Sequence, residues 1–345
     1  MDEAALYGNP ALHGFLRSAA VTRRVPQSLL VEGAVGLGKK TFCRAVSKLL
    51  FCKEEALAHC GCTACLKLKR NSHPDVFYIA EEKGSDAGKL LLPRPIIGGA
   101  EKAISVSTIR KLSAHAPILP NEANCKLYVI DCTSGITKEA QNAFLKLLEE
   151  PPTFVQFILL AVDKSDLLDT ILSRVQVLSV APLGHEDFLA AAKAHGLERE
   201  LAEGLFLLCE GNLGQALSLS APLEDPVISL CLEFLQALVA GDAWETALLM
   251  EKFAGFAGKD RLKLYNLVAF LCKMCYLSFA AALKGNRAFP SFCEDTLSAL
   301  SLRGPDKIKG LIAQVETLMT QIKANVTLTS ALTAFHAGLH TTFLA

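Results

Sequence analysis

The chain has 345 residues, 35 lysines and arginines against 35 aspartates and glutamates, and a hydrophobic fraction of 51%. This length and apolar content exclude an extended disordered chain and predict two or three globular domains. The zero formal charge argues against a protein whose main task is to coat nucleic acid, because that task needs a basic surface that releases counterions.

The N-terminal stretch MDEAALYGNPALHGF is acidic and mixed, so no secretory signal is predicted. Apolar stretches such as Leu267 to Leu283, which Lys273 interrupts, indicate buried helices rather than a clean membrane span of about 20 residues. Twelve cysteines without an export signal favour reduced thiols or a metal site over disulfides. We therefore expect a cytoplasmic protein with no membrane contact.

Residues 28–50 predict a phosphate-binding loop. A short apolar strand, Ser28 to Val31, precedes the segment GAVGLGKKT, and a helix is predicted from Lys39 to Leu50. Strand, glycine loop and helix in this order are the context that a P-loop requires, and Lys39 is placed to reach the β- and γ-phosphates. Three glycines let backbone N–H groups face a phosphate at the helix N-terminus: Gly33, Gly36 and Gly38. The alternative is an ordinary turn that joins a strand to a helix.

One position of this loop departs from the pattern. GxxxxGK[ST] calls for a hydroxyl side chain that holds Mg²⁺, and here that position is Lys40, with Thr41 one residue later. Lysine cannot coordinate magnesium. Either Thr41 replaces the missing hydroxyl in an altered geometry, or the loop no longer supports metal-assisted hydrolysis.

Four cysteines lie together in the string CKEEALAHCGCTAC, whereas the other eight are scattered: Cys52, Cys60, Cys62 and Cys65. Four thiolates can surround one tetrahedral zinc ion and leave no open position for a water, so the site would be structural. We predict a zinc module at about residues 51–73 that depends on the metal for its folding. Ordinary buried or reactive thiols are the alternative, and His73 is favoured as a loop residue over a substitute ligand because Pro74 follows it.

The segment KLYVID, Lys126 to Asp131, predicts a strand that ends in an acidic residue, as the second half of a P-loop site requires. Cys132 follows at the position where such sites usually carry a glutamate that activates water. Two catalytic positions, Lys40 and Cys132, are therefore non-standard.

Next, KEAQNAFLKLLEEPP predicts a helix with one apolar face that Pro151 and Pro152 terminate, and FVQFILLAV predicts a buried strand. Alternating strands and helices of this kind predict a largely parallel sheet covered on both faces. The segment from Lys83 to Ala100 contains Gly and Pro residues and predicts an exposed loop.

In this order, the motifs resemble the delta-prime family of clamp-loader subunits of bacterial DNA polymerase III, which are AAA+ relatives. The resemblance is strongest from about Gly14 to Leu217. It rests on the P-loop region, the cysteine cluster followed by HPD at 73–75, ISVSTIRKL at 104–112, KLYVID, AQNAFLKLLEEPP and TILSR. The order and spacing together, rather than any single motif, are typical of clamp-loader subunits.

The resemblance implies a role for Ser173 and Arg174. In the family, the arginine of this Ser-Arg motif reaches across a subunit interface to the γ-phosphate of ATP bound by a neighbour, where a delocalised cation stabilises the negative charge of the transition state. Val175 replaces the cysteine that usually follows. From its position alone, a local ion pair at a strand end would be the favoured interpretation of Arg174.

Two more departures concern nucleotide handling. The polar residue that senses the γ-phosphate is replaced by Ala161 or Val162, and the arginine that active relatives place on the lid falls at Gly214. Four such positions are thus altered while Arg174 is kept. The resemblance therefore implies a subunit that binds ATP weakly or not at all and completes a neighbour's site.

The expected fold class is α/β: a P-loop AAA+ parallel-sheet domain with the zinc module as an insertion, a small helical lid and an all-α domain. The expected boundaries are 1–181, 182–222 and 223–345, with PLEDP at 222–226 as a linker. The resemblance assigns the last domain to the collar of a pentameric loader.

The resemblance implies an accessory subunit without intrinsic ATPase activity, which assembles with ATPase subunits and delta in a hetero-pentamer. It would reach the sliding clamp and primed DNA mainly through the complex. The first alternative is a genuine P-loop ATPase that uses Lys39, Thr41 and Asp131. The second is a zinc-containing adaptor without a role in replication.

Overall fold

In the computed structural model the chain forms two compact units, residues 1–187 with 212–214, and residues 188–211 with 215–345. The structure describes residues 6–22, 24–52, 60–70, 72–80, 103–220, 226–258, 261–284, 289, 293–324 and 326–343. The loop predicted at Lys83 to Ala100 and most of the linker predicted at 222–226 lie outside these residues. Pro226 itself is the first residue of a helix rather than part of a linker.

The first unit contains one parallel sheet, as predicted. Its strands are β1 (Ser28–Glu32), β2 (Val76–Ile79), β3 (Lys126–Asp131), β4 (Val155–Ala161) and β5 (Gln176–Ser179). They lie in the order β2-β3-β4-β1-β5, and every neighbouring pair is parallel. The strand that leads into the glycine loop, β1, is therefore an inner strand between β4 and β5.

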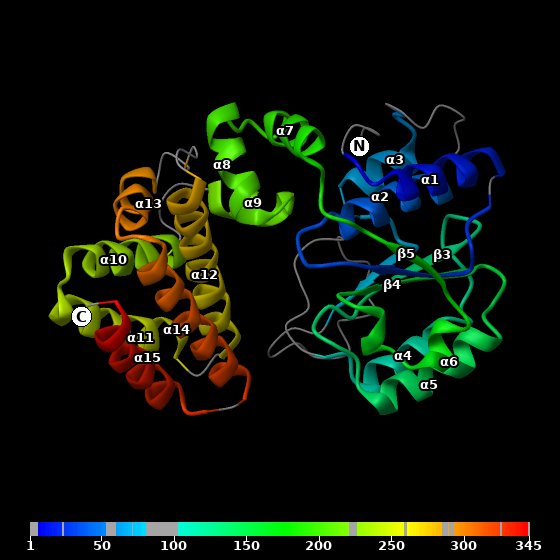
Figure 1. The fold of residues 1–345 in the computed structure, drawn as a ribbon. Helices are drawn as coiled ribbons and strands as arrows, with labels where there is room; N and C mark the ends of the chain where they lie inside the picture. The colour runs from blue at the N-terminus through cyan, green and yellow to red at the C-terminus, as the bar shows by residue number, and fades with distance from the viewer. Residues whose placement is uncertain are drawn as a thin grey trace. The chain divides into compact units, whose positions relative to one another are not determined.

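Helices cover both faces of this sheet (Figure 1). On one face lie α1 (Pro10–Thr22), α2 (Lys39–Phe51) and α3 (Thr63–Lys69), and on the other lie α4 (Val106–His115), α5 (Lys138–Glu149) and α6 (Asp169–Leu172). Because successive strand side chains point to opposite faces, Leu29 and Val31 join the apolar core beneath α1 and α2, whereas Leu30 joins the core beneath α4 and α5. A short 3₁₀ helix, η3 (Lys164–Asp166), follows β4.

Helix α5 illustrates how local sequence sets these elements. The Thr137 hydroxyl accepts a hydrogen bond from the Ala140 amide at 3.2 Å and caps the helix N-terminus. Ala140, Phe144 and Leu148 are buried against the sheet, and the helix ends at Glu149, two residues before Pro151. The helix predicted from this sequence is confirmed.

Parallel register gives the sheet two chemically different edges. Glu32 pairs with Ala161 and Asp131 with Leu160, so the carboxyl ends of β1, β3 and β4 share one edge. Segments that precede β4 and β5 lie at the opposite edge. This separation decides which of the predicted site residues can meet.

The second unit is helical throughout its described residues. Its helices are α7 (His185–Ala194), α8 (Arg199–Cys209), α9 (Leu213–Ser220), α10 (Pro226–Ala240), α11 (Ala243–Ala257), α12 (Arg261–Lys284), α13 (Glu294–Ser301), α14 (Pro305–Lys323) and α15 (Leu328–Thr342). The first residues of α7 and α9 belong to the first unit. Phe234 packs on Phe253 and Phe335, with ring centroids 5.6 and 5.9 Å away. These contacts join α10, α11 and α15 around one apolar core.

Among the described helices, the Lys263–Leu283 part of α12 is long and apolar enough to cross a membrane by length and composition alone. Buried residues make up 56% of its most apolar window. Core helices meet the same criterion, and α12 packs against α11, α13 and α14.

Candidate functional site

The glycine loop connects β1 to α2, as predicted. Gly38 has a φ of 96° and immediately precedes the helix, which begins at Lys39. Gly33 has a φ of 148°, and a Cβ placed there would lie 2.7 Å from the Val180 carbonyl oxygen. Glycine is thus required at both ends of the loop, once for the turn into the helix and once for close approach to the chain after β5.

The loop lysine, Lys39, is turned back onto the loop. Its ammonium donates to the carbonyls of Gly33 and Ala34, the second at 3.0 Å, and only 5% of the residue is exposed. Burial lowers the pKa of Lys39 to about 8, although the charge of Asp131 opposes this shift. Hydrogen bonds to two backbone oxygens therefore hold the ammonium group beside the loop.

Asp131 lies at the end of β3 beneath α2 and is fully buried. Its Oδ1 accepts from the Thr133 amide at 3.1 Å and the Thr133 hydroxyl at 2.6 Å, and its Oδ2 accepts from the Tyr78 hydroxyl. The Lys40 ammonium lies 3.3 Å from Oδ2. Burial raises the pKa of Asp131, but these hydrogen bonds and the Lys40 charge outweigh it and hold the pKa below its ordinary value.

The structure therefore brings Lys40, rather than Thr41, to the acidic residue. Thr41 lies half-buried in the first turn of α2. Tyr78 and Thr133 are site residues that sequence reasoning missed. For Tyr78, the available signal was its place in a strand that could pair with β3.

Cys132 points away from the loop. Because side chains alternate along the strand, Asp131 faces α2, whereas Cys132 belongs to the apolar core on the other face and is 2% exposed. A glutamate at this position would place a carboxylate in that core. The glutamate is therefore absent from a position whose surroundings are apolar.

Residues 212–214 belong to the first unit and contact the outside of the loop. The Asn212 side-chain amide donates to the Val35 carbonyl at 2.8 Å, and the Gly214 amide donates to the Gly36 carbonyl at 3.0 Å. A Cβ at Gly214 would lie 2.5 Å from the Gly36 oxygen, so no side chain fits there unless the backbone shifts. The sequence analysis noted that Gly214 stands where active relatives carry an arginine, but it did not predict the contact with Gly36.

The position of the sensing residue also differs from the pattern. Strand β4 ends at Ala161, and the next acidic residue, Asp163, caps η3 by accepting from the Ser165 amide at 2.8 Å. At the same edge, the Glu32 carboxylate accepts from the Lys164 amide at 3.1 Å and from the Ser179 hydroxyl. Glu32 thus ties β1 to the segments after β4 and within β5.

The four predicted metal ligands come together. The sulfur atoms of Cys52, Cys60, Cys62 and Cys65 all lie within 4.8 Å of one another. Cys52 follows the last residue of α2, and Cys62 caps α3, where its sulfur accepts from the Cys65 amide at 3.5 Å. The Cys60 sulfur accepts from the Cys62 amide at 3.4 Å.

This cluster fits a tetrahedral metal ion. Zinc–sulfur bonds of about 2.3 Å place four thiolates about 3.8 Å apart, which the cluster approaches without a change of fold. None of these four described cysteines forms a disulfide bond. His73 is not in the cluster, because its ring packs at a tilt against Phe51 with centroids 4.4 Å apart and its Nδ1 accepts from the Asp75 amide at 3.2 Å.

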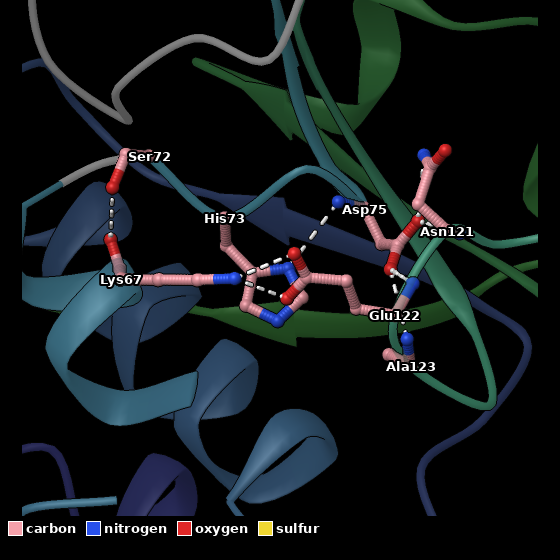
Figure 2. Close-up of polar contacts among 7 residues, drawn as sticks. All are labelled: Lys67, Ser72, His73, Asp75, Asn121, Glu122 and Ala123. Atoms are coloured by element: carbon pink, nitrogen blue, oxygen red, sulfur yellow. Dashed lines mark hydrogen bonds and ion pairs between the residues drawn. The ribbon is translucent and has the colours of Figure 1, made fainter. Parts of the chain in front are cut away.

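A buried carboxylate that sequence reasoning missed lies next to this module (Figure 2). Asp75 is fully buried, and its oxygens accept from the backbone amides of Asn121, Glu122 and Ala123 at 2.6 to 2.9 Å and from the Asn121 side chain at 3.2 Å. Glu122 also pairs with Lys67 of α3. The segment before β3 is thus joined both to the start of β2, through Asp75, and to the cysteine module, through Lys67.

Replacing Asp75 with asparagine is expected to lower the free energy of unfolding by about 2–3 kcal/mol, because one acceptor oxygen and the charge are lost while the amides stay buried. Burial raises the pKa of Asp75, but the hydrogen bonds from 121–123 outweigh it and lower the pKa overall. The difference between wild type and variant should therefore be full above the unfolded pKa of about 3.9 and shrink as pH falls through the lower folded value.

Urea denaturation at several pH values measures this difference. Asp187→Asn, at an exposed aspartate of the same unit, is the matched control and should change stability by less than about 0.5 kcal/mol. Equal effects of the two substitutions would show that the Asp75 contacts do not stabilise the fold.

Arg174 lies at the sheet edge opposite the glycine loop. It follows α6 and precedes β5, whose four residues alone separate it from the carboxyl edge by about 13 Å. One guanidinium nitrogen donates to the Thr170 carbonyl at 2.8 Å and the Ser173 hydroxyl at 2.9 Å, and the other pairs with Glu149 at 2.8 Å. The structure thus does not bring Arg174 together with Lys39 and Asp131 of its own chain.

Residues 8–184 match the model of a protein family described as DNA polymerase III, delta subunit. The DNA polymerase III subunit delta' of Bacillus subtilis (strain 168) is 28% identical over 175 residues, which is 50% of this chain and 48% of that protein. The Escherichia coli (strain K12) subunit delta' is 29% identical over 161 residues, 45% of this chain and 42% of that protein. The chain thus aligns with about half the length of these relatives.

The chain is also similar to a solved structure, that of a DNA polymerase III gamma subunit-related protein from Thermotoga maritima. The match covers 97% of this chain and 99% of that protein. The identity is 17% and the TM-score is 0.47.

Proposed function

Because the chain belongs to the DNA polymerase III delta-subunit family, we propose that it is a delta-prime-type clamp-loader subunit. It would donate Arg174 to a neighbour's ATP site and would not hydrolyse ATP itself. The observation that carries this proposal is the position of Arg174 at the edge of the sheet that is remote from its own glycine loop. An arginine so placed can act on a nucleotide only when another subunit presents one to that edge.

The loop residues support the second part of the proposal. Gly33, Gly36, Gly38 and Lys39 form the expected loop, but the Lys39 ammonium is bonded to loop carbonyls and Lys40 stands in place of the hydroxyl. We propose a degenerate nucleotide site from these residues with Thr41 and Asp131, with weak or no ATP binding.

For the four-cysteine cluster we propose structural zinc. Four thiol ligands are the donor set that zinc prefers, and a bound ion would balance thiolates that burial otherwise disfavours. Burial and the neighbouring thiols Cys52 and Cys62 raise the pKa of Cys65 in the metal-free chain. Zinc would hold together α2 and α3, which residues 53–59 separate in the sequence. It would have no role in ATP hydrolysis.

The remaining assignments follow from the family. We propose an AAA+ domain at 1–181, a lid at 182–222 and a collar at 223–345. The partners would be ATPase subunits and delta in a hetero-pentamer, in the cytoplasm, with the sliding clamp and primed DNA contacted mainly through the complex. The helical character of α10–α15 supports a collar made of packed helices.

Co-purification tests the proposal. The tagged full chain, expressed with the other loader subunits of its own organism, is expected to form a stable complex on size exclusion, whereas the isolated chain should show no nucleotide turnover. Turnover by the isolated chain that disappears in Lys39→Ala would instead establish the alternative, an active P-loop ATPase. Failure to enter any complex would favour an adaptor without a role in replication.

A further inference from the structure

The buried carboxylate of Asp131 has a full set of partners. A carboxylate offers about four lone-pair positions. Two of them, on Oδ1, are taken by the amide and hydroxyl of Thr133, and those on Oδ2 by the Tyr78 hydroxyl and the Lys40 ammonium. Oδ1 thus accepts two hydrogen bonds, and Oδ2 accepts one and forms an ion pair with Lys40, so a metal ion or its bound water would have to displace one of these partners.

Lys40 is held in this place by more than one contact. Its ammonium lies 3.3 Å from Asp131 Oδ2 and 5.2 Å from the centroid of the Tyr78 ring, a cation–π arrangement. Its side chain is 27% exposed, whereas that of Asp131 is completely buried. Because the carboxylate is buried from water, the Lys40 ammonium, as its ion-pair partner, supplies counter-charge to it.

Magnesium does not fit this arrangement. The ion needs near-octahedral oxygen ligands at about 2.0–2.1 Å, and a P-loop supplies a hydroxyl from the position that is here Lys40. An ion at that place would also stand beside the ammonium group of Lys40, a positive charge that an intact P-loop does not carry at this position. Lys40 thus opposes a divalent cation in two ways, since it removes a ligand and adds a positive charge.

We propose that the Lys40 ammonium group permanently replaces the divalent metal ion of this loop, so that it neutralises Asp131 and excludes Mg²⁺ whether or not a phosphate ligand is present. The inference rests on the proposed function only in treating residues 33–41 as a degenerate nucleotide loop. It adds a cause to the expected lack of hydrolysis, and it predicts that one substitution restores metal dependence.

The test compares the full-length wild type with Lys40→Ser, which removes the ammonium and returns a hydroxyl to the loop. Binding of a fluorescent ATP analogue is measured with Mg²⁺ and with EDTA. Wild type should show no Mg²⁺-dependent binding, whereas Lys40→Ser should bind at least about tenfold more tightly with Mg²⁺ than with EDTA. A tenfold Mg²⁺ dependence in wild type, or none in Lys40→Ser, would overturn the proposal.

Two further variants control for charge. Lys48→Ser removes a lysine from the last turn of the same helix and should behave as wild type, and so should Lys40→Arg, which keeps the cation. If Lys40→Ser does not fold, Mn²⁺ binding to the wild type still tests whether the loop excludes divalent cations. Electron paramagnetic resonance measures this binding. Mn²⁺ bound by wild type but not by Asp131→Asn would contradict the proposal, and its absence would support it.

These outcomes are separate from those of the proposed function. Arg174 takes no part in the loop, so a negative result with Lys40→Ser leaves the donation of Arg174 untouched. Conversely, if an Arg174 variant has no effect on ATP turnover, the Mg²⁺ measurements above still test whether Lys40 excludes the metal.

Discussion

Replacing Arg174 with alanine is expected to slow ATP turnover at the neighbouring site by about 10³-fold or more, which is the usual contribution of an arginine finger. The reason is that the transition state concentrates negative charge on the γ-phosphate, and Arg174 would be the cation that meets it from outside the subunit. The measurement is the ATPase rate of the reconstituted complex, resolved so that the affected site is seen separately in single-turnover experiments.

The local contacts of Arg174 do not hinder this role. Its ion pair with Glu149 joins two half-exposed side chains, and such pairs contribute about 0–1 kcal/mol. The guanidinium can therefore leave Glu149 at small cost when a phosphate is presented. The local ion pair and the role in trans are thus compatible rather than competing descriptions.

Arg174→Lys and Arg110→Ala sharpen the experiment. Lysine keeps the charge but not the planar fork, so it should restore little of the rate. Arg110 is an exposed arginine of α4, and its loss should leave the rate unchanged. If Arg174→Ala and Arg110→Ala give the same ATPase rates in an intact complex, Arg174 is not an arginine finger.

Replacing Cys65 with serine is the second change with a large expected effect. The zinc content of freshly purified protein should fall from about one ion per chain to nearly none, because a hydroxyl is a far poorer ligand than a thiolate. Loss of a structural zinc ion removes several kcal/mol from folding, so the thermal midpoint of the first unit should fall by about 10 °C or more.

Cys125→Ser is the matched control, since Cys125 is a half-buried cysteine outside the cluster. It should retain zinc and nearly the wild-type midpoint. Elemental analysis and calorimetry on the three proteins give both quantities. Wild-type protein with much less than one zinc per chain would count against the metal itself, whereas a Cys65→Ser variant that retains zinc would count against the ligand set.

Much of the first unit was predictable because its signals are local. The run KLYVID gives β3 the predicted limits, Lys126–Asp131, and β1 extends one residue beyond the predicted Val31 to Glu32. Short apolar runs define these strands, and the close spacing of four cysteines identifies the cluster that could hold a metal ion. Each of these patterns lies within a few consecutive residues.

The contacts that were missed join distant segments. Asp75 bonds to backbone amides some 46 residues along the chain, Tyr78 meets Asp131 across neighbouring strands, and Gly214 meets Gly36. Such pairs depend on strand order and register, which no local pattern specifies. A backbone amide also carries no side-chain signal, so the three main-chain partners of Asp75 leave no trace in the sequence.

The glycine loop and Arg174 lie at opposite edges of the sheet, so the two ends of the subunit are not equivalent. The face that carries the glycine loop and the face that carries Arg174 are different surfaces, so a contact that joins one to the other is heterologous and cannot close as a twofold dimer. Under the proposed function, this chain is competent on the Arg174 face alone. In a row of related subunits it would give an arginine without needing to receive one, and that asymmetry would assign it a single terminal position.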